Sequence, residues 1–167
     1  MKRQSRWHKR SWALAWIMQI RSYSEYRCKT LQKLQRAQNT LARVVTRCSH
    51  YDSAIIKLQK LHWLPIKQRF DFKICVVIFK TLTINSPAYL ATILNSYKPA
   101  RTLRSTNNNV LQISHRKTVT GTRAFRCAVP QLWNSLSADI TSLHSLDYFR
   151  QKLKTFLFLQ VYGFSVI

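Results

Sequence analysis

The scarcity of glycine and proline is the feature of this sequence that most restricts its fold. The 167 residues include two glycines and four prolines. A turn-rich sheet protein needs many such residues, because glycine adopts positive φ and proline fixes the first position of many turns. We therefore predict a mainly α-helical chain, a small helical bundle with a short β-hairpin or irregular insertion around residues 100–123.

Hydrophobic periodicity predicts where the helices lie. Over about 29–47, the residues Leu31, Leu34, Leu41 and Val45 fall on one side of a helix, so we expect that face to be buried. Further helices are predicted at about 52–61 (capped by Asp52 or Ser53), 66–82, 88–94, from Pro130, and at 145–160. The stretch 66–82 is apolar on most of its surface, which indicates a central, buried helix.

Composition divides the chain into four regions. Residues 1–28 form an atypical basic extension, 29–94 a helical region, 95–124 a basic loop or hairpin, and 125–167 a C-terminal helical region. The third region is rich in Thr, Ser and Asn, with a β-like patch at 110–113. The apolar stretch 13–20 is too short to span a bilayer and no small-residue cleavage site follows it. We therefore predict neither a signal peptide nor a transmembrane segment.

The charge of the chain is strongly one-sided. There are 28 Lys and Arg residues against 5 Asp and Glu, a formal net charge of +23. Self-repulsion on this scale opposes a compact state, and a polyanionic partner relieves it. RNA or DNA, bound through its backbone, is the partner that this charge favours, and an anionic membrane surface is the second candidate.

Three groups of cations are the candidate phosphate contacts. In the predicted helices the spacing of the cations places them in rows, and successive helical turns about 5.4 Å apart would present them along a backbone. A solvated helix face explains such rows equally well. The candidates are Arg36, Arg43 and Arg47; Arg69, Lys73 and Lys80; and Arg101, Arg104, Arg116, Lys117 and Arg123. Trp63 and Trp133 could stack on bases, but their leucine neighbours favour core positions.

The chemistry of the sequence favours binding over catalysis. Phosphoryl-transfer enzymes need carboxylates that converge on metal ions, and the five acids here are scattered with no two adjacent. No glycine-rich phosphate loop occurs. The cysteines Cys28, Cys48, Cys75 and Cys127 form no CxxC pair, which argues against a metal site and favours thiols in a reducing compartment, nuclear or cytoplasmic. We expect no enzyme activity, metal, cofactor or small-molecule substrate.

Six phrases of the sequence, in order, resemble the C-terminal region of LINE-type, jockey-like non-LTR retrotransposon reverse transcriptases. They are LQKLQRAQNTLARVVT (31–46), LHWLPIKQRFDFKICVVIFKTL (61–82), SPAYL (86–90), RTLRS (101–105), RKTVTGTRAFRCAVPQLWNSL (116–136) and SLDYFRQKLKTFLF (145–158). The resemblance covers about residues 29–158. It implies that 29–94 is similar to the polymerase thumb, which helps to hold the template and the primer duplex.

The chain also departs from that family. The paired aspartates of the YxDD-type motif and the endonuclease domain are absent, and residues 1–28 do not match. Arg47 stands where glycine or threonine is common, and Ser137 where proline is common. The resemblance thus implies a truncated fragment without the catalytic palm, which binds RNA or DNA without sequence preference. A non-functional translated remnant of a mobile element and a basic amphipathic membrane-surface binder are the alternatives.

Overall fold

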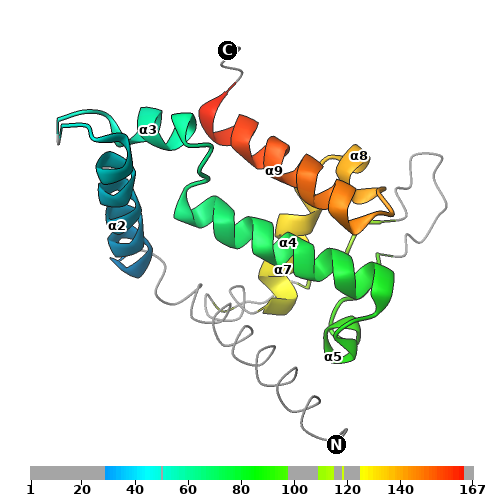
Figure 1. Ribbon diagram of the computed structural model, residues 1–167. Helices are drawn as coiled ribbons and strands as arrows, with labels where there is room; N and C mark the ends of the chain where they lie inside the picture. The colour runs from blue at the N-terminus through cyan, green and yellow to red at the C-terminus, as the bar shows by residue number, and fades with distance from the viewer. Residues whose placement is uncertain (1–28, 50, 98–108, 115–117, 119–124, 164–167) are drawn as a thin grey trace, which may run out of the picture. The chain divides into compact units, whose positions relative to one another are not determined.

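The computed structural model describes residues 29–49, 51–97, 109–114, 118 and 125–163. Within these ranges the chain is mainly helical, as predicted (Figure 1). The helices are α2 (Lys29–Thr46), α3 (Ala54–Lys60), α4 (Ile66–Ile84), α5 (Ala88–Ala91), α7 (Phe125–Asn134), α8 (Ala138–Thr141) and α9 (Leu146–Tyr162). In the described ranges, no helix combines the length and the apolar character needed to cross a membrane. The predicted extension 1–28 lies outside the described residues.

Two compact units make up the chain. Unit 1 contains the described residues between 78 and 142, and unit 2 contains those between 29 and 77 and between 143 and 163. The boundary falls inside α4, so the first part of that helix belongs to unit 2 and its last part to unit 1. This division groups α9 with α2 and α3, whereas the regions predicted along the sequence place the C-terminal helices together.

Unit 1 is built around Trp133 of α7. The indole is 1% exposed, and its Nε1–H donates to the carbonyl of Asn109 at 2.8 Å. The side-chain amide of Asn134 pairs with both the N–H and the carbonyl of Leu111, at 3.0 and 2.9 Å. Leu111 also forms an antiparallel bridge with Ser96. The β-like patch predicted at 110–113 thus contributes one bridge, while residues 98–108 lie outside the described part.

Two helices of unit 1 differ from their predicted bounds. The prediction that Pro130 begins a helix was wrong, because α7 begins at Phe125 and contains Pro130. Proline lacks the N–H that a helix interior uses, so burial of Val129 and Trp133 has to compensate for the missing hydrogen bond. The helix predicted over 88–94 is the single turn α5, which ends at Ala91.

Unit 2 contains α2, α3, the first part of α4, and α9. Helix α2 packs against α3. Helix α9 buries Phe149, Leu153 and Leu157, and α4 buries Ile74 and Cys75. Burial of α4 at these positions agrees with the predicted buried helix. The spacing of four residues between the buried positions of α9 agrees with the helical periodicity that the sequence shows.

In the described part of the chain, three helices end in a left-handed residue that is not glycine. These residues are Arg47, His62 and Asn85, with φ of 49°, 52° and 55°. After α2 the Cys48 N–H donates to the Arg43 carbonyl at 3.1 Å, and after α3 the Trp63 N–H donates to the Leu58 carbonyl at 2.9 Å. Both are six-to-one hydrogen bonds of the Schellman type, in which glycine is the usual left-handed residue.

The apolar face of α2 is not buried as predicted. Leu34, Leu41 and Val45 are 43%, 53% and 52% exposed, whereas the buried residues of this helix are Gln38 and Ala42. The small Ala42 allows close packing, and the Gln38 amide is fixed by a hydrogen bond. The buried residues Gln38 and Ala42 therefore lie along one edge of the apolar face of α2. The other edge, which carries Leu34 and Leu41, is exposed.

Candidate functional site

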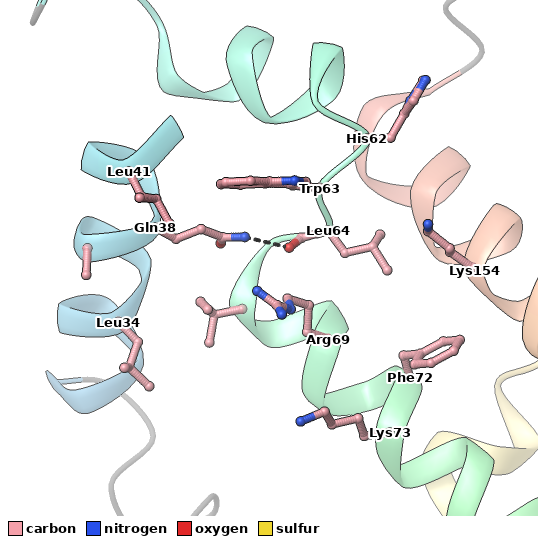
Figure 2. A pocket seen from close by; sticks show the side chains of 12 residues that line it. Leu34, Gln38, Leu41, His62, Trp63, Leu64, Arg69, Phe72, Lys73 and Lys154 are labelled. Carbon is pink, nitrogen blue, oxygen red and sulfur yellow. Dashed lines mark hydrogen bonds between the residues drawn. The ribbon is translucent and has the colours of Figure 1, made fainter. Parts of the chain in front are cut away.

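A groove of about 800 Å³ lies within unit 2, lined by residues of α2, the α3–α4 connection, α4 and α9 (Figure 2). Its described lining is mostly apolar, with three cations and no acid. The lining residues are Leu34, Ala37, Gln38 and Leu41 of α2; His62, Trp63 and Leu64 of the connection; Ile66, Arg69, Phe72 and Lys73 of α4; and Lys154 of α9. We call this surface the α2–α4 groove.

Two glutamines of α2 hold one wall of the groove in place. The Gln38 side chain is 6% exposed, and its Nε2 donates to the Leu64 carbonyl at 2.9 Å, as Figure 2 shows. The Gln35 Oε1 accepts from the Ile66 N–H at 2.9 Å, which satisfies a backbone donor of the first turn of α4. The Gln35 Nε2 in turn donates to Gln38 Oε1 at 3.1 Å.

Helix α9 anchors the same connection from its other side. The Tyr162 hydroxyl donates to the Trp63 carbonyl at 2.7 Å. The rings of His62 and Phe158 meet edge to face, with 5.7 Å between centroids. Desolvation raises the pKa of Tyr162, so its hydroxyl keeps the proton that it donates. The connection between α3 and α4 is therefore fixed by side chains of two other helices.

The groove brings together two of the predicted cations and one cation that was not predicted. Arg69 and Lys73 are exposed, lie one helical turn apart on α4, and both line the groove. Lys154 of α9 is exposed and lines it as well. Lys80 is half-buried on the part of α4 that belongs to unit 1, so the structure does not gather it with the other two.

The other predicted cations within the described ranges do not line the groove. Arg36 lies on α2 and Arg47 directly follows that helix, and both are exposed. Arg43 is half-buried, and its Nε is buried without a hydrogen-bond partner in the described part. The predicted candidates in the insertion lie outside the described residues; they are Arg101, Arg104, Arg116, Lys117 and Arg123.

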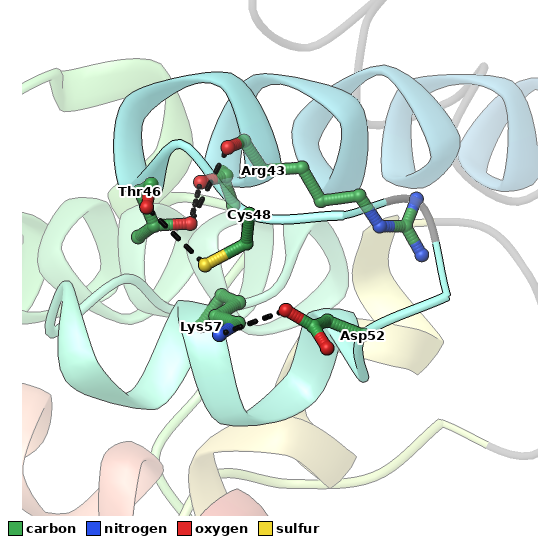
Figure 3. A network of polar contacts seen from close by, with 6 residues as sticks. Arg43, Thr46, Cys48, Asp52 and Lys57 are labelled. Carbon is green, nitrogen blue, oxygen red and sulfur yellow. Dashed lines mark hydrogen bonds and ion pairs between the residues drawn. The ribbon is translucent and has the colours of Figure 1, made fainter.

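The junction of α2 and α3 carries a small polar network (Figure 3). The Cys48 thiol donates to the Thr46 carbonyl at 3.2 Å, and the Lys57 ammonium pairs with Asp52 at 3.3 Å. A hydrogen bond from Lys57 is the main cause that lowers the pKa of the Cys48 thiol. Asp52 thus pairs with Lys57, and the N-cap of α3 is Ser53, without a side-chain cap hydrogen bond.

The remaining chemistry-bearing residues are placed as follows. Trp133 is a core residue, as predicted, whereas Trp63 is half-buried and lines the groove. Cys75 and Cys127 are buried free thiols, and desolvation raises the pKa of Cys75 to about 12. Among the described residues, no three His, Cys, Asp or Glu side chains are grouped so as to hold a metal ion.

Comparison with known proteins adds no relative. The chain matches no family model, and neither a curated protein nor a solved structure matches it.

Sequence reasoning missed Gln35, Gln38 and Lys154. The glutamines are polar residues of a predicted amphipathic helix, and periodicity assigns them no partner. Gln35 and Gln38 are three residues apart on one helix, but their hydrogen bonds to Ile66 and Leu64 join residues that are 31 and 26 positions apart in the sequence. Lys154 lies in the middle of α9 beside the buried Leu153, and its spacing along that helix does not connect it with the cations of α4.

Proposed function

We propose that unit 2 binds RNA or DNA through its backbone, without sequence preference. The observation that carries the proposal is the excess of exposed cations in unit 2, among them Arg36 on α2 and Arg47 directly after that helix. The whole chain has 5 acids, which cannot neutralise 28 cations. A phosphate backbone supplies closely spaced charges of the opposite sign.

Two of the five acids already pair with cations of unit 2. Lys57 pairs with Asp52, and Arg150 pairs with Asp147 at 3.1 Å. Exposed arginines such as Arg36 and Arg47 can donate two parallel hydrogen bonds to one phosphate. Contacts of this kind position a nucleic acid but do not read its bases, so we expect little preference among sequences.

We further propose that the chain is related to the C-terminal, thumb-like region of a non-LTR reverse transcriptase. The six phrases of the sequence support this relationship, and a thumb that holds template and primer is consistent with backbone binding. The chain lacks the YxDD motif, so the proposed role is binding and not polymerisation. Sequencing the DNA upstream of this reading frame tests the origin: a palm-encoding stretch with YxDD is expected, and unrelated DNA contradicts it.

The binding proposal is tested by titrating labelled single-stranded RNA and duplex DNA at several salt concentrations. We expect affinity to fall about 10³-fold or more between about 50 and 200 mM salt, as for proteins with several phosphate contacts. In the double variant Arg36→Gln/Arg47→Gln, the slope of log affinity against log salt should decrease by about 1 for each phosphate that is no longer bound.

Arg150→Gln is the matched control, because it removes one charge whose guanidinium already pairs with Asp147. We expect it to change the slope less than either Arg36→Gln or Arg47→Gln. Salt-independent binding, or equal effects of all three variants, would contradict the proposal. Stronger binding to anionic vesicles than to oligonucleotides would favour a membrane surface instead.

A further inference from the structure

Helix α2 leaves one edge of its apolar face uncovered along its whole middle section. Leu34 and Leu41 line the α2–α4 groove, yet they are 43% and 53% exposed. Val44 and Val45 continue the edge and are 68% and 52% exposed. Soluble domains seldom expose contiguous apolar surface, and such surface is typical of an interaction site.

The spacing of this edge is that of a helix-packing seam. Leu34, Ala37, Leu41 and Val44 are separated by three, four and three residues, the a/d pattern by which one helix packs along another. The seam is about 15 Å long at 1.5 Å per residue, or nearly three turns. A second helix laid along α2 would cover it.

The opposite wall of the groove carries cations. Figure 2 shows Arg69 and Lys73 reaching from α4 on the side of the groove that faces α2, and Lys154 contributed by α9. No acid is found among the described residues that line the groove. A helix seated on the seam would therefore meet positive charge along its flank, which favours Asp and Glu at those positions.

Other occupants fit these observations less well. Bases stack on aromatic faces, but the seam is aliphatic and Trp63 is the one indole among the described lining residues. A second copy of the chain would bring together two molecules of net charge +23. A bilayer surface accepts a protruding apolar face, whereas these side chains line a concave groove.

We propose that the α2–α4 groove binds an amphipathic helix of a partner protein, with apolar residues against α2 and acidic residues beside Arg69, Lys73 and Lys154. This is the helix-in-groove mode of recognition, in which anchors spaced by three and four residues supply the affinity. The site is distinct from the nucleic-acid contacts proposed at Arg36 and Arg47, which do not line the groove.

The test uses a fluorescein-labelled helical peptide of about 18 residues, with one seam of leucines and glutamates on both flanks. Its binding to the full chain is measured by fluorescence anisotropy at about 150 mM salt, which weakens non-specific electrostatic attraction. Two peptides are compared with it: the same seam with lysine flanks, and a scrambled peptide of identical composition. We expect the glutamate peptide to bind with Kd on the order of micromolar, at least about tenfold tighter than either comparison peptide.

Variants locate the binding surface. Leu41→Asp should weaken the peptide about tenfold or more, and Arg69→Gln and Lys154→Gln by a few fold each. The controls are Ile55→Asp, on an equally exposed apolar residue outside the groove, and Lys67→Gln, on an exposed cation of α4 that does not line it. Both controls should bind as the unchanged chain does.

Three results would overturn the proposal: no binding of the glutamate peptide, equal binding of the scrambled peptide, or an unchanged affinity in Leu41→Asp. Displacement of the peptide by single-stranded RNA or by phosphatidylserine vesicles, with Leu41→Asp weakening the competitor too, would assign the groove to that competitor. The nucleic-acid proposal is judged separately, because its variants at Arg36 and Arg47 leave the groove intact.

Discussion

The two units differ in what they do with apolar and charged residues. In unit 1, Trp133, Phe79 and Leu111 are buried, and side-chain hydrogen bonds join Trp133 to Asn109 and Asn134 to Leu111. The described cations of this unit are Lys80 and Arg126. In unit 2 the described helices carry most of the described cations and leave the leucine edge of α2 exposed. Unit 1 also exposes Leu82, Ile84 and Tyr97, so the clearest difference between the described parts of the two units is the concentration of cations in unit 2.

The largest expected effect tests whether Trp133 is the structural centre of unit 1. Trp133→Ala should lower the free energy of unfolding by about 3–5 kcal/mol, because it leaves a large cavity and removes the donor to Asn109. Leu41→Ala in unit 2 should cost less than about 1 kcal/mol, because that side chain is 53% exposed. Urea denaturation measures the free energy of unfolding of both variants. Equal decreases in the two variants would contradict the structural role given to Trp133.

Thiol reactivity should also separate an exposed junction from a buried core. Cys48 has a lowered pKa beside Lys57, so more of it is thiolate at a given pH, whereas burial raises the pKa of Cys75 to about 12. At pH 7.5 we expect iodoacetamide to modify Cys48 about a hundredfold faster than Cys75, as followed by peptide mass spectrometry. Lys57→Gln should move the pH–rate midpoint of Cys48 upward; an unmoved midpoint would show that Lys57 does not set it.

The glutamine contacts of unit 2 predict a smaller loss of stability. Gln38→Ala leaves the Leu64 carbonyl without its donor and should cost about 1–3 kcal/mol of unfolding free energy. Gln32→Ala, at an exposed position of the same helix, is the matched control and should change it by less than about 0.5 kcal/mol. Equal effects would mean that the α3–α4 connection does not depend on α2.

The smallest predicted effect is a gain in stability. Arg47 has φ of 49°, and this conformation costs an ordinary residue about 1–2 kcal/mol more than it costs glycine. Part of that gain is offset by the greater freedom of glycine in the unfolded chain, so Arg47→Gly should stabilise by about 0.5–1 kcal/mol. Arg47→Ala is the control, because alanine has the same backbone strain at this φ as arginine. If Arg47→Ala stabilises the protein as much as Arg47→Gly does, the gain comes from removal of the charge and not from relief of strain.

Much of the fold follows from local sequence, and its exceptions have physical causes. The helical class and the positions of α2, α4 and α9 could be predicted because apolar spacing records them directly. The face of α2 that is buried could not be predicted. Gln38 and Ala42 are buried instead of the leucines, and the contact of Gln38 with Leu64 joins residues that are distant in the sequence. The ends of α2 and α3 were predicted to within one residue, but the left-handed conformation of Arg47 and His62 was not, because the usual glycine signal is absent there.

The candidate site was predicted in part. Arg69 and Lys73 were identified from their spacing of one turn on α4, and they line the groove. Lys154 joins them from another helix, which no spacing rule along the chain reveals. The groove itself was not predicted, because periodicity assigned its leucines to the core.

Amide hydrogen exchange, measured with and without a short RNA, is the most direct test of nucleic-acid binding by unit 2, since it reports on both units in one sample. If unit 2 binds RNA through Arg36 and Arg47, adding RNA slows exchange in α2 and at the Arg47 junction, this protection is lost in Arg36→Gln/Arg47→Gln, and exchange in α7 does not change. Protection of α7 without protection of α2, or protection of α2 that survives both substitutions, would contradict it.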